Sequence, residues 1–227
     1  MSSQNQKMNK RSLVQEIKKE FPNLKWHEAK HNIEEWDHYV LILDNKYVFR
    51  FPRIKFYIKR LRDEIFLLSY LKKKKLGIPI PEYKFIAKNE SFAGYSMLKG
   101  EQMINKIYQE MSPKKKKNVA RKLGRFLFVL HKTPLSIAKK YGTGVLDHRT
   151  RYRNLVTDAK KYIKPRIPQK NYVLITDFFK EMKNYQKFPN YRFVHSDLYF
   201  RHIIVDKRKN ITGIIDFSDR RIGDPAI

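Results

Sequence analysis

The chain has 227 residues, a formal net charge of +28 and no cysteine. Hydrophobic residues at 41% and aromatic residues at 14% predict a folded protein of one domain or two small lobes, and they exclude a disordered chain. The absence of cysteine excludes a disulfide, thiolate catalysis and a cysteine-based zinc site. No apolar run is long enough to span a bilayer, and residues 1–6 lack the apolar segment of a signal peptide, which favours a cytoplasmic protein.

The positive charge bears on the choice of partners. An excess of this size attracts polyanions such as nucleic acid or an anionic membrane. The lysines are scattered or form short groups such as Lys72–Lys75 and Lys114–Lys117, and no motif that reads DNA or RNA accompanies them. Solvated helix faces are the favoured interpretation, with no specific nucleic-acid or membrane partner. A basic polyanion-binding module is kept as an alternative, which salt-dependent DNA retention tests.

The first part of the chain predicts helices around a small antiparallel sheet. Apolar residues at helical spacing predict two helices, over 12–21 and 55–75. Strand-like runs separated by turn residues predict a hairpin and then two further strands, over 39–43, 47–51, 83–86 and 94–98.

The second part is predicted to be mainly helical. Ser112 followed by Pro113 is a typical helix start, and the helix is expected to run through His131. Two more helices are expected, over 149–163 and 172–185. The apolar runs 203–205 and 211–215 flank a turn-rich segment and predict a second hairpin near the end of the chain.

This second hairpin is expected to bring three chemically active side chains together. Asp197 and His202 precede its first strand, and Asp216 follows its second strand, 19 positions after Asp197. Two carboxylates and an imidazole that meet at one point suit phosphoryl transfer, in which one Asp takes or orients a substrate hydroxyl and the other groups hold Mg²⁺. A hydrolytic metal site is a rival use of the same side chains, and a hydrogen-bonded core His is the plain alternative.

The motifs around these residues are similar to those of a known family. His195-Ser196-Asp197, with His202 five positions later, and then Asp216-Phe217-Ser218 follow the layout of the protein-kinase patterns H-R-D-x-x-x-x-N and D-F-G. The lines Ile214–Asp219 and Gly223–Ala226 resemble more closely the aminoglycoside phosphotransferase family. The likeness is to members that modify a 2″-hydroxyl and to the related macrolide phosphotransferases, a branch in which His also occurs in place of Asn at position 202.

The resemblance implies a two-lobed, protein-kinase-like α+β fold. A small antiparallel-sheet lobe over residues 1–98 is expected to bind nucleotide, and a mainly helical lobe over 99–227 to carry the catalytic loop. The implied reaction moves the γ-phosphoryl group of ATP or GTP to a hydroxyl of a small molecule, an aminoglycoside or macrolide antibiotic above all, with Mg²⁺ as cofactor. The two helices over 149–163 and 172–185 are expected to lie between the 113–131 helix and the catalytic loop and to shape the acceptor site.

The resemblance also assigns the catalytic and metal-binding roles. Asp197 is implied to accept or orient the hydroxyl proton, and His202 and Asp216 to hold Mg²⁺. Met97, Leu98 and Lys99 are implied to lie beside the nucleotide base, mainly through backbone groups and apolar contact. A core strand that ends in a turn is the alternative for this last segment.

Two residues of the first lobe are implied to position the phosphates. Arg50 takes the place of the lysine found in many relatives, and an arginine keeps the charge with a different shape and reach. Glu64, on the following helix, is its implied partner. The alternatives are an outward-facing Arg50 and a surface pair between Glu64 and Arg60 four positions before it.

Two departures from the family pattern bear on activity. No glycine precedes Gly77, although loops that cover phosphates favour glycine, and the candidate loop 32–38 carries acidic side chains. The chain also ends at Ile227 where relatives continue, so we expect a truncated second lobe that self-associates through uncovered apolar surface. A catalytically impaired remnant that only binds nucleotide is therefore a second alternative.

Overall fold

A computed structural model describes the chain except for residues 1–7, 33–35, 147, 185–189 and 226–227. The elements of its first part are α1 (Lys10–Glu20), β1 (Ala29–Asn32), β2 (His38–Leu43), β3 (Tyr47–Pro52), α2 (Lys55–Lys72), β4 (Tyr83–Ile86) and β5 (Ala93–Ser96). Those of its second part are β6 (Glu101–Gln102), α3 (Asn105–Gln109), α4 (Pro113–His131), α5 (Leu135–Lys140), α6 (His148–Asp158), α7 (Gln169–Asn184), β7 (Arg192–Val194), β8 (Ile203–Val205), β9 (Ile211–Ile214) and β10 (Arg221–Gly223). Within the described ranges, no helix combines the length and apolar character needed to cross a bilayer.

The first part is built on one antiparallel sheet with the strand order β1-β2-β3-β5-β4. The predicted hairpin is confirmed, since β2 and β3 pair in register from His38 opposite Pro52 to Leu43 opposite Tyr47. Asp44 and Asn45 in its turn have φ values of 49° and 50°. This left-handed conformation, which Asn and Asp tolerate well, matches the twist of a tight hairpin.

Alternation along β3 decides which side chains reach the site. Phe49 and Phe51 point into a core shared with α1, which also buries Leu13 and Ile17. Because successive side chains of a strand point to opposite faces, Arg50 lies on the other face of the sheet. That is the face that carries the hollow described below.

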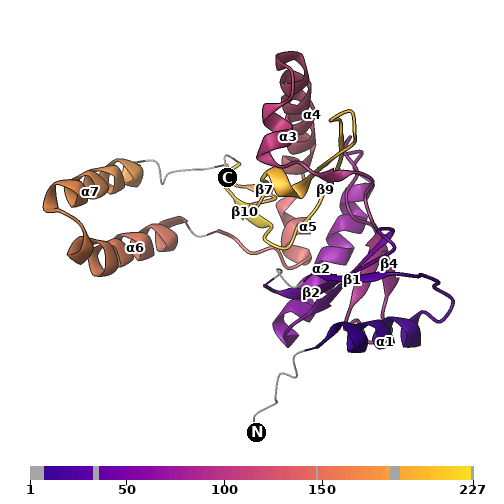
Figure 1. Cartoon of the computed structure of the whole chain (residues 1–227). Helices are drawn as coiled ribbons and strands as arrows, with labels where there is room; N and C mark the ends of the chain where they lie inside the picture. Colours follow the sequence, from indigo (N-terminus) through magenta and orange to yellow (C-terminus); the bar gives the residue numbers. More distant parts are fainter. Residues whose placement is uncertain (1–7, 33–35, 147, 185–189, 226–227) are drawn as a thin grey trace, which may run out of the picture.

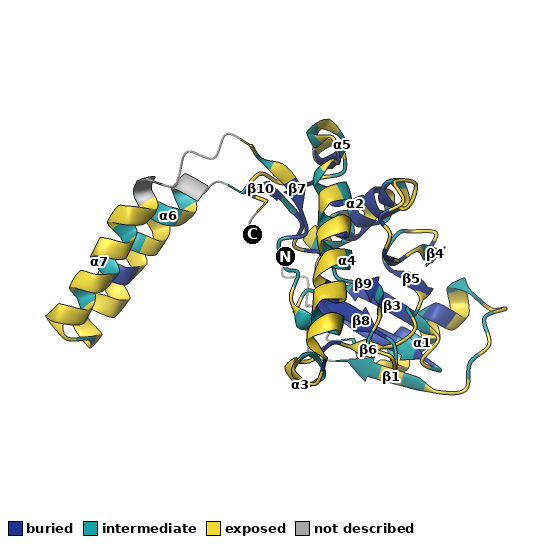
Figure 2. Cartoon of the chain, turned by 90° about the horizontal axis from the view of Figure 1, so that it is seen from above, coloured by how far each residue is buried: buried dark blue, intermediate teal, exposed yellow. Residues whose placement is uncertain are grey.

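Helix α4 is central to the second part (Figure 2). It begins as predicted, with the Ser112 hydroxyl accepting a hydrogen bond from the Lys115 N–H at 3.3 Å and Pro113 in the first turn. Its buried face packs into a core shared with the neighbouring strands, which contains Phe126, Leu130, Phe193, Ile203, Ile214 and Phe217. Strand β8 pairs with both β6 and β9, so the predicted second hairpin is also found.

Helices α6 and α7 form a pair that extends away from the rest of the chain (Figures 1 and 2). The Tyr152 hydroxyl donates to the Phe179 carbonyl at 2.7 Å and joins the two helices. The helix predicted over 149–163 keeps α-helical geometry only to Asp158, and a π-helical turn follows before Pro165, which disfavours a continued helix. The expectation that these helices lie between the 113–131 helix and the catalytic loop is therefore wrong for this structure.

Candidate active site

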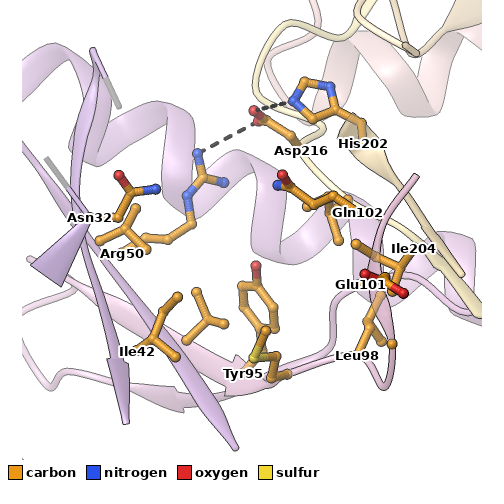
Figure 3. A pocket seen from close by; sticks show the side chains of 15 residues that line it. Asn32, Ile42, Arg50, Tyr95, Leu98, Glu101, Gln102, His202, Ile204 and Asp216 are labelled. Atoms are coloured by element: carbon orange, nitrogen blue, oxygen red, sulfur yellow. Dashed lines mark ion pairs between the residues drawn. The ribbon is translucent and has the colours of Figure 1, made fainter. Parts of the chain in front are cut away.

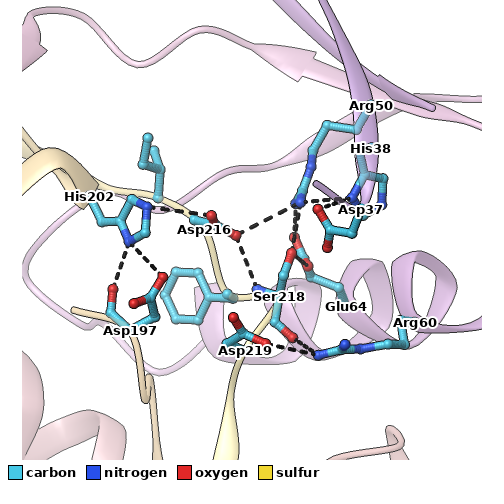
Figure 4. Close-up of polar contacts among 12 residues, drawn as sticks. Asp37, His38, Arg50, Arg60, Glu64, Asp197, His202, Asp216, Ser218 and Asp219 are labelled. Atoms are coloured by element: carbon cyan, nitrogen blue, oxygen red, sulfur yellow. Dashed lines mark hydrogen bonds and ion pairs between the residues drawn. The ribbon is translucent and has the colours of Figure 1, made fainter. Parts of the chain in front are cut away.

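Three side chains at the ends of the second hairpin converge on one point (Figure 4). One possible ligand atom each from Asp197, His202 and Asp216 lies within 4.8 Å of the others. The Ile215 N–H donates to the His202 carbonyl at 3.0 Å, which keeps the two ends of the hairpin side by side. The convergence predicted from the hairpin is therefore found in the structure.

The hydrogen bonds of His202 define the state of its ring. Nδ1 lies 2.6 Å from the Asp197 backbone oxygen, and a carbonyl oxygen only accepts, so Nδ1 carries the proton. In the neutral ring Nε2 then presents its lone pair to Asp216 Oδ2, 3.4 Å away. Two acceptors that face each other favour a cation between them, and the donor set therefore fits a divalent metal ion.

The two carboxylates of this cluster are pushed toward different protonation states. Burial raises the pKa of Asp197, and the charges of Asp216 and Asp219 add to the rise. Burial also acts to raise the pKa of Asp216, but the charge of Arg50 and the hydrogen bonds from Ser218 lower it below its usual value. Asp216 is thus held ionised, while Asp197 has the greater tendency to take up a proton.

The cluster lies where two hollows meet. The first has a volume of about 170 Å³ and is lined mainly by apolar side chains, among them Val40, Val48, Tyr95 and Leu98 (Figure 3). The second has a volume of about 480 Å³ and is mostly polar, with Tyr57, Arg60, Asp197, Tyr199 and Asp219 in its wall. His202 and Asp216 line both hollows, so they separate an apolar binding space from a polar one.

The predicted base-contacting segment lies between the first hollow and a separate groove. Met97 and Leu98 line the first hollow. Lys99 lines a separate groove with Thr212, whose hydroxyl donates to the Lys99 carbonyl at 2.6 Å. Met97 and Leu98 also line this groove, whereas Lys99 is absent from the lining of the first hollow.

Arg50 and Glu64 form the ion pair that was expected, with 3.0 Å between Nη1 and Oε1. Glu64 is only 2% exposed and Arg50 is also buried, so an outward-facing Arg50 and a surface pair with Arg60 are both excluded. Burial acts against the charge of Arg50, but Tyr83, Glu64 and Asp216 raise its pKa well above the usual value. The pair thus places a permanent cation at the wall of the first hollow.

Sequence reasoning missed three further partners of Arg50. Nη1 also donates to the Tyr83 hydroxyl at 3.3 Å, while Nη2 donates to the Ser218 hydroxyl at 2.7 Å and lies 3.2 Å from His38 Nδ1. These residues come from separate strands and from the loop after β9, so no local pattern connects them. The one available signal was a serine at position 218, where the D-F-G pattern has glycine.

His195 connects the two loops that carry the cluster. Its Nε2 donates to the Ile215 carbonyl at 3.0 Å, and its buried Nδ1 has no partner among the described residues. Burial lowers the pKa of His195 to about 4, and the bond to Ile215 only partly opposes this. The ring is therefore neutral in the folded protein at neutral pH.

This neutral ring predicts a pH-dependent stability. Between the unfolded pKa near 6.5 and the folded pKa of about 4, the unfolded chain binds the proton first, so acidification favours unfolding by up to about 3 kcal/mol. Urea unfolding from pH 7 to pH 4 should show a smaller loss of stability in His195→Asn than in the unchanged protein. The other histidines are common to both proteins, so they do not affect the comparison. An equal dependence of the free energy of unfolding on pH in the two proteins would contradict the prediction.

The fold and the cluster together define a kinase-like phosphotransferase. A sheet and its helix hold a buried Arg–Glu pair, and a loop Asp lies beside two candidate cation ligands, as kinase-type phosphoryl transfer requires. The chain belongs to the phosphotransferase enzyme family, whose model matches residues 32–227. The predicted family and the kinase-like mixed α and β fold are thereby confirmed.

Solved structures similar to this chain include aminoglycoside and macrolide phosphotransferases. The GDP complex of wild-type aminoglycoside 2'-phosphotransferase-IIIa matches with a TM-score of 0.85 at 24% identity, over 96% of this chain and 75% of that chain. A GDP and kanamycin complex of an aminoglycoside phosphotransferase matches with a TM-score of 0.83 at 25% identity, over 95% and 75% of the two chains. Macrolide 2'-phosphotransferase type I matches with a TM-score of 0.67 at 22% identity, over 95% and 73%.

Proposed function

We propose that this protein transfers the γ-phosphoryl group of ATP or GTP to a hydroxyl of a small molecule. The convergence of Asp197, His202 and Asp216 at the junction of two hollows carries the proposal. The apolar hollow suits a nucleotide base, and the polar hollow suits an acceptor rich in hydroxyl groups. Relatives solved with GDP, ADP or ATP support a nucleotide donor.

The proposed reaction gives each of the three clustered residues a separate role. Asp197 lines the acceptor hollow and accepts or orients the hydroxyl proton, a task that its raised pKa favours. His202 and Asp216 would hold Mg²⁺. The chemistry that the ion would supply there is neutralisation of the charge on the phosphates.

Arg50 and Glu64 are proposed to position the phosphates from the first hollow. Glu64 fixes the guanidinium through the 3.0 Å ion pair. Both terminal nitrogens of Arg50 already bond to protein groups, so a direct phosphate contact would use the Nε–H or replace one of these bonds. Met97 and Leu98 would flank the base, and any contact from Lys99 would come from its backbone.

For the acceptor we propose an aminoglycoside-like or macrolide-like antibiotic, with resistance as the biological outcome. Support comes from a relative solved with gentamicin and from relatives described as macrolide 2'-phosphotransferases. Because the proposed donor is a nucleoside triphosphate, we place the reaction in the cytoplasm.

A panel of aminoglycosides and macrolides incubated with γ-labelled ATP or GTP tests this proposal. Label should appear on at least one antibiotic, in a product that mass spectrometry identifies as its phosphate ester. Nucleotide binding without transfer to any acceptor would contradict the reaction and favour a chain that only binds nucleotide.

His202 gives the proposed cation site a testable metal preference. Imidazole nitrogen favours Mn²⁺ over Mg²⁺ more strongly than an amide oxygen does. In thermal-shift titrations with GTP or ATP, the unchanged protein should reach half-saturation at a lower concentration of Mn²⁺ than of Mg²⁺. In His202→Asn, the half-saturation concentrations of Mn²⁺ and Mg²⁺ should lie closer together than in the unchanged protein. The same ratio in both proteins would argue against His202 as a ligand.

Self-association is proposed as a further interaction of this chain. The α6–α7 pair exposes the large apolar side chains Leu174 and Phe178, and such surfaces on soluble proteins mark contact sites. Sedimentation should therefore reveal species larger than one chain that shift toward the monomer in Leu174→Glu. A monomer at every concentration would contradict this proposal.

A further inference from the structure

Ser218 joins the functional side chains of the two lobes (Figure 4). Its hydroxyl accepts from Arg50 Nη2 at 2.7 Å and donates to Glu64 Oε2 at 3.4 Å. Its backbone N–H donates to Asp216 Oδ1 at 3.3 Å. One buried residue thus touches the pair proposed to position the phosphates and one of the carboxylates proposed to hold the metal.

The chemistry of a hydroxyl group suits this position. A serine side chain accepts and donates at the same time, so it fits between a guanidinium that only donates and a carboxylate that only accepts. The Ser218 backbone is also held, because Arg60 of α2 donates to its carbonyl. The hydroxyl is therefore fixed in place and can fix Arg50 in turn.

The backbone next to Ser218 shows that this loop is constrained. Asp216 has a φ of 62°, a left-handed conformation that residues other than glycine rarely adopt. Such a conformation persists only where the surrounding contacts determine it. The bond from the Ser218 N–H to Asp216 is one of these contacts, so the position of the carboxylate depends on that of Ser218.

We propose that Ser218 is a positioning residue that sets Arg50 and Asp216 relative to each other. Its hydroxyl holds the Arg50 guanidinium against Glu64, and its N–H holds the Asp216 carboxylate. Ser218 thereby fixes the distance between the cation proposed to position the phosphates and the proposed metal site. This inference rests on the proposed function. The Mg²⁺ dependence of nucleotide binding should therefore require the hydroxyl group, whereas folding should not.

Ser218→Ala tests this role because it removes the hydroxyl and keeps the N–H. In titrations of GTP and of ATP, the Mg²⁺ concentration for half-maximal nucleotide binding should rise about tenfold, because a hydrogen bond to a charged group is lost. The affinity for the same nucleotides in EDTA should change by less than about twofold. A general loosening of the fold would instead weaken nucleotide binding both with and without Mg²⁺. Ser218→Thr should restore the original Mg²⁺ dependence.

A double-mutant cycle that combines Ser218→Ala with Arg50→Lys tests whether Ser218 acts through Arg50. The single ammonium group of Arg50→Lys cannot bond Glu64 and Ser218 with the fork geometry of a guanidinium. Adding Ser218→Ala to Arg50→Lys should therefore change the Mg²⁺ midpoint by less than about twofold. Ser69→Ala, at an exposed position of α2, is the matched control for loss of a hydroxyl group.

Folding is checked separately by thermal unfolding without ligand. If Ser218→Ala does not fold, Ser218→Cys replaces it, because a thiol keeps the volume and bonds only weakly. Failure of the unchanged protein to bind nucleotide at any Mg²⁺ concentration would overturn the proposed function as well as the role of Ser218. Normal binding with an unchanged Mg²⁺ midpoint in the variant, or equal effects of Ser218→Ala with and without Arg50→Lys, would overturn the role of Ser218 alone.

Discussion

Asp197→Asn is expected to lower the rate of phosphotransfer by about 10²- to 10⁴-fold, the usual contribution of a positioned general base. Asparagine keeps the size of the side chain and one oxygen atom, but it cannot take up a proton at neutral pH. Asp197 lines the acceptor hollow and is absent from the lining of the apolar hollow. Nucleotide affinity should therefore change little, and the loss should appear in kcat.

Asp219→Asn provides the matched control for this experiment. Asp219 lines the same hollow, but its carboxylate pairs with Arg60 at 3.4 Å and Arg221 at 3.6 Å and is not part of the three-residue cluster. The rate of phosphotransfer by Asp219→Asn should stay close to that of the unchanged protein. An unchanged rate of phosphotransfer in Asp197→Asn would exclude Asp197 as the group that accepts or orients the hydroxyl proton.

Glu64→Ala should lower the free energy of unfolding by about 3–5 kcal/mol, the usual cost of leaving a buried charge without its partner. The carboxylate lies between two buried arginines, 3.0 Å from Arg50 Nη1 and 3.8 Å from Arg220 Nη1. Its removal leaves two cations in the interior without their shared counter-charge. Equilibrium unfolding in urea at neutral pH measures the loss.

An exposed ion pair between Arg62 of α2 and Glu90 of the β4–β5 turn gives the control for Glu64→Ala. Glu90 lies 3.0 Å from Arg62, and the two side chains are 43% and 46% exposed. Glu90→Ala should cost less than about 1 kcal/mol, because water screens a surface pair. A similarly small loss of unfolding free energy for Glu64→Ala would contradict the prediction, because it would mean that other groups neutralise the buried arginines.

The parts of the fold that could be predicted from the sequence depend on short-range rules. The β2–β3 hairpin follows from a tight turn at Asp44 and Asn45, and the convergence of Asp197, His202 and Asp216 follows from the β8–β9 hairpin, whose ends must meet. The Arg50–Glu64 pair was expected from the family resemblance, which places a helix carboxylate beside the cation of the preceding strand. In each case few residues separate the elements concerned.

The rest depends on packing between distant segments. Ser218 and Arg50 are 168 positions apart, and nothing in either local sequence indicates that they bond. The periodicity over α6 and α7 indicated helices, but an amphipathic pattern does not specify which surface a helix covers. Lys99 lines a groove outside the first hollow, a placement that propensity rules do not foresee.

Electron paramagnetic resonance of Mn²⁺ bound together with GTP or ATP tests the proposed cation site most directly. The geometry predicts an ion whose spin-echo modulation shows coupling to a histidine nitrogen. This coupling should disappear in His202→Asn, and the ion itself should bind much more weakly in Asp216→Asn. A bound ion without nitrogen coupling, or with the same affinity in Asp216→Asn, would contradict a metal site formed by these residues.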